Sequence, residues 1–164
     1  MKEPKPIKRS KELMQLSRDH HLGLLLCWKI RTGLSNNIDE ERIKAYVVAA
    51  YAQELKEHFY QEEQLLFNPM PEDDLMVCKA IEQHSAIRDL EQQISVAQQP
   101  AKELLTQFAD LLEQHIRYEE RELFPYLEAA LDAETLSIAG AAVDKYHETA
   151  EPLNWSDEFW IRKR

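Results

Sequence analysis

Two stretches of the chain follow one template. Residues 58–67 read HFYQEEQLLF, and residues 115–124 read HIRYEERELF. Each places a histidine four residues before a glutamate, and on a helix this spacing brings both side chains to one face. Imidazole and carboxylate groups are metal ligands, so such a pair can bind one metal ion or two adjacent ones. The repeat therefore predicts these metal ligands: His58, Glu62, His115 and Glu119.

Two further histidines lie on apolar helical faces. His20 lies one turn before Leu24, and His84 lies one turn before Ile87. Apolar residues at three- and four-residue steps mark the face of a helix that points into the core. His21 is adjacent to His20, and only the helical phase favours His20 as the inward residue. The spacing predicts that both inward histidines reach the same depth as the repeated pairs.

The convergence of these side chains predicts a metal site. Burying two carboxylates without a cation costs several kcal/mol each, and the neighbouring inward positions offer no lysine or arginine. A bound metal ion supplies the compensating charge. The candidate ligands exceed the four that a tetrahedral zinc site takes, and they suit two metal ions bridged by carboxylates. Mixed imidazole and carboxylate ligation favours two iron ions, with manganese or zinc as substitutes. The candidate ligands are His20, His58, Glu62, His84, His115 and Glu119.

The composition strongly favours helices, so helices must position these residues. The chain has only three glycines and is rich in Leu, Glu, Gln, Ala, Lys and Arg, which are good helix formers. The first four predicted helices are long and are joined by short loops, which is typical of an antiparallel up-down four-helix bundle. We therefore expect an all-α fold with a short C-terminal helix and tail after the bundle. The predicted helices cover about residues 10–33, 38–67, 73–97, 101–131 and 133–147.

These predicted helices also suggest the domain organisation. We expect residues 1–9 to be a disordered lead-in and residues 10–131 to form the bundle. Residues 132–164 would then form a C-terminal helix and an aromatic tail that packs on the bundle. Four other residues have weaker expectations. Glu63 and Glu120 would support the ligands or lie in solvent, or would be ligands themselves if the helices were rotated. His147 would be a surface or packing residue, and Tyr118 would be a core residue or a hydrogen-bond donor to the site.

The charge and the cysteines narrow the function classes. A net charge of −10 argues against nucleic-acid binding, which normally requires a basic face. No stretch approaches the roughly 20 apolar residues that span a membrane, and the N-terminus lacks the apolar core of a signal peptide. Cys27 and Cys78 are isolated, which predicts no disulfide framework. We therefore expect a cytoplasmic protein that binds neither nucleic acid nor membranes.

The motifs resemble those of the hemerythrin-like, or HHE cation-binding, domain family. The resemblance covers about residues 10–131 and implies a four-helix bundle around a non-haem di-iron centre, with the six ligands named above. One departure concerns the oxygen-carrying hemerythrins, which have a second histidine one turn after the third-helix ligand, where this chain has Arg88. An iron with one imidazole fewer keeps an open or water-filled position. The motifs are RDHHLGLLL (18–26), HFYQEEQLLF (58–67), EQHSAIRDLE (82–91) and HIRYEERELFPYLE (115–128).

This resemblance leaves three functions open. The first is a binding or sensing protein for O2, NO, iron or redox state, which would signal through a protein partner. The second is a di-iron enzyme or repair factor that acts on peroxide or NO, or donates iron. The third is a structural metal site that stabilises the bundle. The sequence does not decide whether the protein is an enzyme.

Overall fold

The computed structural model describes residues 8–98 and 100–162, and these residues form helices without any β-strand. The predicted all-α class is confirmed, and the helices agree with the predicted segments to within a few residues. After a short turn at Lys11–Leu13, the elements are α1 (Met14–Ser35), α2 (Glu40–Ala50), α3 (Lys56–Gln61), α4 (Leu75–Val96), α5 (Lys102–Tyr118), α6 (Phe124–Ala130) and α7 (Ala133–Thr149).

Wider helical turns join some of these elements into longer helices. The turns Tyr51–Leu55 and Glu62–Phe67 make residues 40–67 one helix, and the turn Glu119–Leu123 makes residues 102–130 another. They are π-helical, since Asn68 N–H donates to the carbonyl of Glu63, five residues earlier, at 2.9 Å. π-Turns of this kind often occur at functional sites. Two of the three begin at Glu62 and Glu119, which are predicted ligands.

Aspartate caps set the beginnings of several helices. The side chain of Asp39 accepts a hydrogen bond from Glu41 N–H, and Asp74 and Asp132 accept likewise at the starts of α4 and α7. Such caps satisfy backbone N–H groups that the first turn of a helix leaves without partners. The loop before α2 contains Asn37, whose φ of 54° suits an asparagine better than most residues. Short polar loops therefore fix where each long helix begins.

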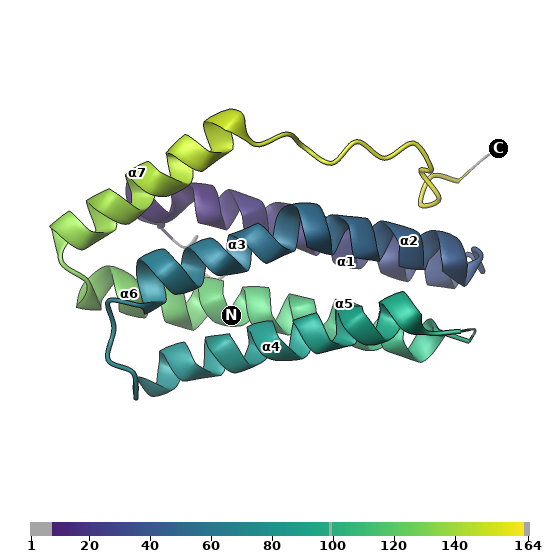
Figure 1. The fold of residues 1–164 in the computed structure, drawn as a ribbon, viewed down its shortest axis with the longest axis horizontal. Coiled ribbons are helices and arrows are strands. Elements are labelled where there is room, and N and C mark those ends of the chain that lie inside the picture. The colour runs from purple at the N-terminus through teal and green to yellow at the C-terminus, as the bar shows by residue number, and fades with distance from the viewer. Residues whose placement is uncertain (1–7, 99, 163–164) are drawn as a thin grey trace, which may run out of the picture.

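The long helices lie side by side (Figure 1). α1 packs against α2 and α5, and α4 also packs against α2 and α5. α7 crosses over one end, where it contacts the Lys11–Leu13 turn, α1 and the Glu62–Phe67 turn. No helix in the described part of the chain is long and apolar enough to span a membrane.

The apolar core is divided into two clusters. One contains Leu26, Phe59 and Phe108, and the other contains Leu66 and Phe124. On each long helix, the predicted histidine lies between a residue of one cluster and a residue of the other. The polar site thus occupies a layer between two apolar clusters, where burial gives it a low effective dielectric constant.

The C-terminal segment returns along the outside of the helices. Trp155, Phe159 and Trp160 surround the ring of Tyr46 at centroid distances of 5.5, 5.7 and 5.1 Å. Phe159 is only 2 % exposed and belongs to the first apolar cluster. At the other end, residues 1–7 of the predicted lead-in lie outside the described residues. The predicted domain boundaries therefore stay predictions.

Candidate metal centre

The structure brings all six predicted residues together in one buried layer. His20 comes from α1 and His84 from α4. The repeated template supplies the others: each histidine lies near the end of an α-helix, and each glutamate opens the π-turn that follows. None of the six is more than 6 % exposed. His21 is exposed instead, so the helical phase of α1 selects His20.

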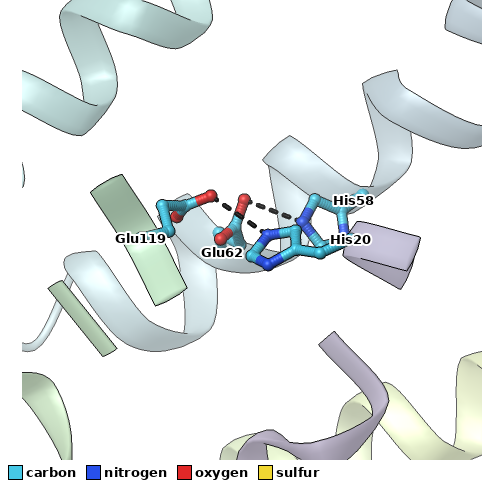
Figure 2. Close-up of side chains that lie close together, drawn as sticks. All are labelled: His20, His58, Glu62 and Glu119. Atoms are coloured by element: carbon cyan, nitrogen blue, oxygen red, sulfur yellow. Dashed lines mark ion pairs between the residues drawn. The ribbon is translucent and has the colours of Figure 1, made fainter. Parts of the chain in front are cut away.

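The side chains form two overlapping clusters. His20 and His58 form the first with Glu62 and Glu119, and the ligand atoms lie within 4.8 Å of one another (Figure 2). His84 and His115 form the second with the same two glutamates. The two candidate cation positions are therefore adjacent, and both carboxylates belong to both. This is the geometry that a pair of bridged metal ions requires.

Short contacts join the imidazoles to the shared carboxylates. His58 Nε2 lies 3.1 Å from Glu62 Oε1, and His115 Nε2 lies 2.7 Å from Glu119 Oε1. His20 Nε2 approaches Glu119 and His84 Nε2 approaches Glu62, each at 3.3 Å. The two Nε2 atoms of His84 and His115 are only 3.0 Å apart. Two ring nitrogens at this distance need a proton or a cation between them.

In three of these histidines, the other ring nitrogen contacts a hydrogen-bond acceptor. His58 Nδ1 donates to Asp19 at 3.0 Å, and His20 Nδ1 donates to Glu120 at 2.6 Å. His115 Nδ1 donates to the amide oxygen of Gln83 at 2.6 Å. A proton held at Nδ1 leaves the lone pair at Nε2, which faces the shared glutamates. These partners therefore orient the imidazoles of His20, His58 and His115 as metal ligation would require.

Buried atoms without partners supply an independent test of metal binding. Among the described residues, Nε2 of His20 and of His58 has no hydrogen-bond partner, and neither has any carboxylate oxygen of Glu62 or Glu119. Buried polar atoms are normally hydrogen-bonded, because an unsatisfied group costs about 1–3 kcal/mol. The atoms left unsatisfied are the donor atoms that a metal ion would take. The donor set therefore fits a pair of cations.

The ionisation of the site points to the same conclusion. Burial raises the pKa of Glu62 well above its usual value, and the charge of Glu119 raises it further. Burial opposes charge on His20 and His84, but the neighbouring carboxylates of Glu119 and Glu120, and of Glu62 and Glu63, raise both pKa values to about 9. Without a metal ion, the buried carboxylates thus need protons to compensate their charge. A metal ion would replace those protons.

Comparison with protein families decides the relationship. Residues 15–127 match the model of the hemerythrin HHE cation binding domain. The chain belongs to this family. The match covers most of the four long helices and all six predicted site residues of this hemerythrin domain. Arg9, α7 and the C-terminal segment lie outside it. No curated protein and no solved structure matches the chain.

The hemerythrin domain has an internal two-fold relationship that extends beyond the repeat. Residues 10–67 form its first half and residues 75–130 its second half. In both halves the residue before a ligand contacts Nδ1 of another ligand: Asp19 contacts His58, and Gln83 contacts His115. The second glutamate of each template contacts the histidine of the other half, with Glu120 at 2.6 Å from His20 and Glu63 at 3.4 Å from His84.

The end of each template has a matching role. The ring of Phe124 stacks on His20 at a centroid distance of 5.2 Å, and that of Phe67 stacks on His84 at 5.9 Å. The histidine, both glutamates and the phenylalanine of the repeated phrase thus have a place around the site. The histidine and first glutamate face the centre, the second glutamate supports a histidine of the other half, and the phenylalanine covers that histidine.

Several residues of the site were missed or left open by sequence reasoning. Asp19 and Gln83 were missed, although each directly precedes a predicted ligand, and that shared position was the available signal. His147 is half-buried and contacts Asp19 at 3.0 Å, so it belongs to the site's surroundings. Tyr118 is a core residue that donates to the carbonyl of Met76 at 2.7 Å. Arg88 is exposed and contacts Ser85, and it does not replace a ligand.

The two halves differ in their access to open space. A cavity of about 220 Å³ borders α1, residues 53–61, α5 and the end of α7. His20, His58 and His115 line it, whereas His84 does not. Access therefore lies on the side of the cation position that His20 and His58 share with the glutamates.

Proposed function

We propose that this hemerythrin domain is a non-haem di-iron protein that binds or senses O2, NO, iron or redox state. The observation that supports it is the pair of buried clusters that share Glu62 and Glu119. In this proposal His20 and His58 hold one iron ion, and His84 and His115 hold the other. Manganese or zinc could occupy the same positions, because neither ligand type excludes them. The four long helices would form the antiparallel up-down bundle predicted from the sequence.

The ligand count supports an open position on each metal ion. Each ion would receive two imidazoles and the two shared carboxylates, and iron commonly takes more ligands than these supply. Iron at such a position supplies reversible redox change and affinity for small ligands such as O2 or NO. The residues of the chain fix the imidazoles through Asp19, Gln83 and Glu120, exclude bulk water by burial, and leave access at the cavity.

The surroundings of the site suggest how a signal would leave it. His147 of α7 contacts Asp19, and Asp19 contacts the ligand His58. A change in metal coordination that moves His58 would therefore alter the seating of α7. α7 lies on the outside, where a protein partner could detect the change. We place this function in the cytoplasm, as the isolated cysteines suggest.

An enzyme or repair factor that acts on peroxide or NO is the second candidate. The observation that favours it over a structural metal site is the cavity at the metal layer, which a structural site does not need. Catalytic turnover of peroxide by the iron-loaded protein would support this candidate over simple binding. Ligand binding without turnover would support the sensing function.

Metal analysis and spectroscopy test the proposal. We expect two iron ions per chain, with charge-transfer absorption that changes on addition of O2 or NO. The double variant His58→Ala, His115→Ala should retain little metal, whereas the exposed control His21→Ala should retain the wild-type amount. Near-full iron occupancy in the double variant would refute the ligand assignment. A colourless zinc protein that does not respond to air would refute both the sensing and the enzymatic functions.

A further inference from the structure

The cavity beside His20 and His58 is larger than a diatomic ligand needs. Its volume is about 220 Å³. A protein cavity of roughly 150 Å³ can hold benzene, so this space suits an organic molecule of about six to nine non-hydrogen atoms. Much of its wall is apolar and includes Leu26, Leu55 and Ile116. Burial of an apolar group against this wall would therefore be favourable.

One polar side chain in the wall lacks a partner. Gln61 is 6 % exposed, and its Oε1 has no hydrogen-bond partner among the described residues. It lies one turn after His58, on the side of the helix that lines the cavity. A buried amide oxygen of this kind favours a ligand that brings an N–H or O–H donor.

The corresponding residue in the second half behaves differently. Tyr118 occupies the same place in the repeated template, immediately before the first glutamate. Its hydroxyl is already bonded to the carbonyl of Met76. At this position of the template, the unsatisfied acceptor therefore belongs to Gln61, which lines the cavity.

The charges of the cavity wall limit the class of ligand further. The ionisable residues that line it, besides the histidines and Tyr146, are Asp19, Glu54 and Glu151, and no lysine or arginine is among the described lining residues. Asp19 is already paired with His58 and His147. The cationic group of the wall, His20, is already paired with Glu119 and Glu120. An anionic ligand would therefore face acidic groups without a free cationic side chain to receive it, which disfavours carboxylates and phosphates.

We propose that this cavity binds a small, mainly apolar organic molecule that is not an anion, and that Gln61 orients it by accepting a hydrogen bond. The ligand would lie next to the metal ion held by His20 and His58. This inference rests on the proposed function only for that neighbour. The cavity, its apolar wall and the free acceptor belong to the chain itself.

Phenol and toluene form a matched pair of probes, because they differ mainly in one hydroxyl group. Binding is measured by titration with NMR detection on the full chain, in metal-free and in zinc-loaded form. Benzoate serves as the anionic probe and is added only to the metal-free form, because a metal ion would itself attract a carboxylate. The variant Gln61→Leu removes the acceptor, and Gln64→Leu makes the same change at an exposed position of the same helix.

We expect phenol to bind in the millimolar range, with shifts at Gly23, Leu26 and Ala150, which line the cavity. It should bind about tenfold more tightly than toluene, because only phenol satisfies the buried oxygen. Gln61→Leu should remove that preference, and Gln64→Leu should preserve it. Benzoate should bind more weakly than phenol.

Several outcomes would overturn the proposal. Three results with the wild-type protein alone would overturn it. They are equal affinity for phenol and toluene, tighter binding of benzoate than of phenol, and NMR shifts away from the cavity. Retention of the phenol preference in a folded Gln61→Leu variant would remove the role of Gln61. Phenol binding to a chain that takes up no metal would defeat the proposed function and leave this inference standing. Metal uptake by a chain that does not bind phenol would refute this inference and leave the proposed function standing.

Discussion

Arg9 offers a sharp test of how the site is supported from outside the family match. Its side chain is only 4 % exposed and donates to Glu128 at 2.7 Å and to Glu120 at 2.8 Å. A further bond reaches the carbonyl oxygen of Glu120 at 2.6 Å. Glu120 in turn accepts from His20 Nδ1. A residue that precedes the matched region thus holds the carboxylate that orients a predicted ligand.

The cost of Arg9→Ala follows from the burial of its partners. Removing one member of a buried ion pair costs about 3–5 kcal/mol, and a single hydrogen bond to a charged group contributes about 1.5–3 kcal/mol. The side chains of Glu120 and Glu128 remain 24 % and 18 % exposed, so water can replace part of what is lost. We therefore expect the free energy of unfolding to fall by about 2–4 kcal/mol.

Arg42→Ala is the matched control. Arg42 makes equally short bonds to Asp157, at 2.6 and 2.9 Å, but its side chain is 42 % exposed. Exposed ion pairs contribute little to stability, so its loss should be much smaller than that of Arg9.

Urea denaturation of the metal-free variants at neutral pH measures both losses, and competition with a chelator measures metal affinity. Arg9→Ala should also weaken metal binding by about tenfold, because Glu120 loses its support. The reasoning is refuted if Arg9→Ala destabilises the protein no more than Arg42→Ala does.

Three further predictions concern the surroundings of the ligands. Asp19→Ala and Gln83→Ala should each lower metal affinity by about 10- to 100-fold in a chelator competition, because each removes the partner of a predicted ligand's Nδ1. Unchanged metal affinity in both variants would show that these contacts do not orient the ligands. Tyr118→Phe should lower the free energy of unfolding by about 1 kcal/mol in urea denaturation, because the hydrogen bond to Met76 is lost, and should leave the metal spectrum unchanged. A shifted spectrum would place the Tyr118 hydroxyl at the metal. In metal-free protein, His20 and His84 have pKa values raised to about 9 from 6.5. Their stabilising contribution is therefore fully present below about pH 6.5 and is lost as the pH rises to about 9, whereas metal affinity rises over the same range as the protons leave. Urea denaturation with a chelator present should show this loss, and a metal-free protein that gains stability between these pH values would contradict it.

Periodicity and spacing were sufficient to predict the helices and to bring the six residues together. On a regular helix only one face points into the core. The phase of the apolar residues therefore selects which histidine, and which glutamate one turn later, lies on that face. This is why His20 could be distinguished from the adjacent His21. The beginnings of α2, α4 and α7 lie at aspartates whose side chains accept hydrogen bonds from the first turn, which is a local signal for a helix start.

The features that were missed depend on contacts between distant segments. Asp19 acts on His58, and Gln83 acts on His115, and neither pairing follows from one helix alone. The free acceptor of Gln61 could not be predicted either, since the template places Tyr118 at the same position with a satisfied hydroxyl. The π-turns at Glu62–Phe67 and Glu119–Leu123 left no trace in the apolar pattern, because Leu66 and Leu123 within them remain buried.

The sharing of Glu62 and Glu119 has a consequence for how the protein is made. Neither cluster draws its side chains from one half alone: the first needs Glu119 of the second half, and the second needs Glu62 of the first. A nascent chain that has not yet reached residue 119 can therefore complete neither cation position, even after α1 and the helix of residues 40–67 have formed. Metal uptake would accordingly come late in synthesis and would favour chains whose four long helices have all assembled.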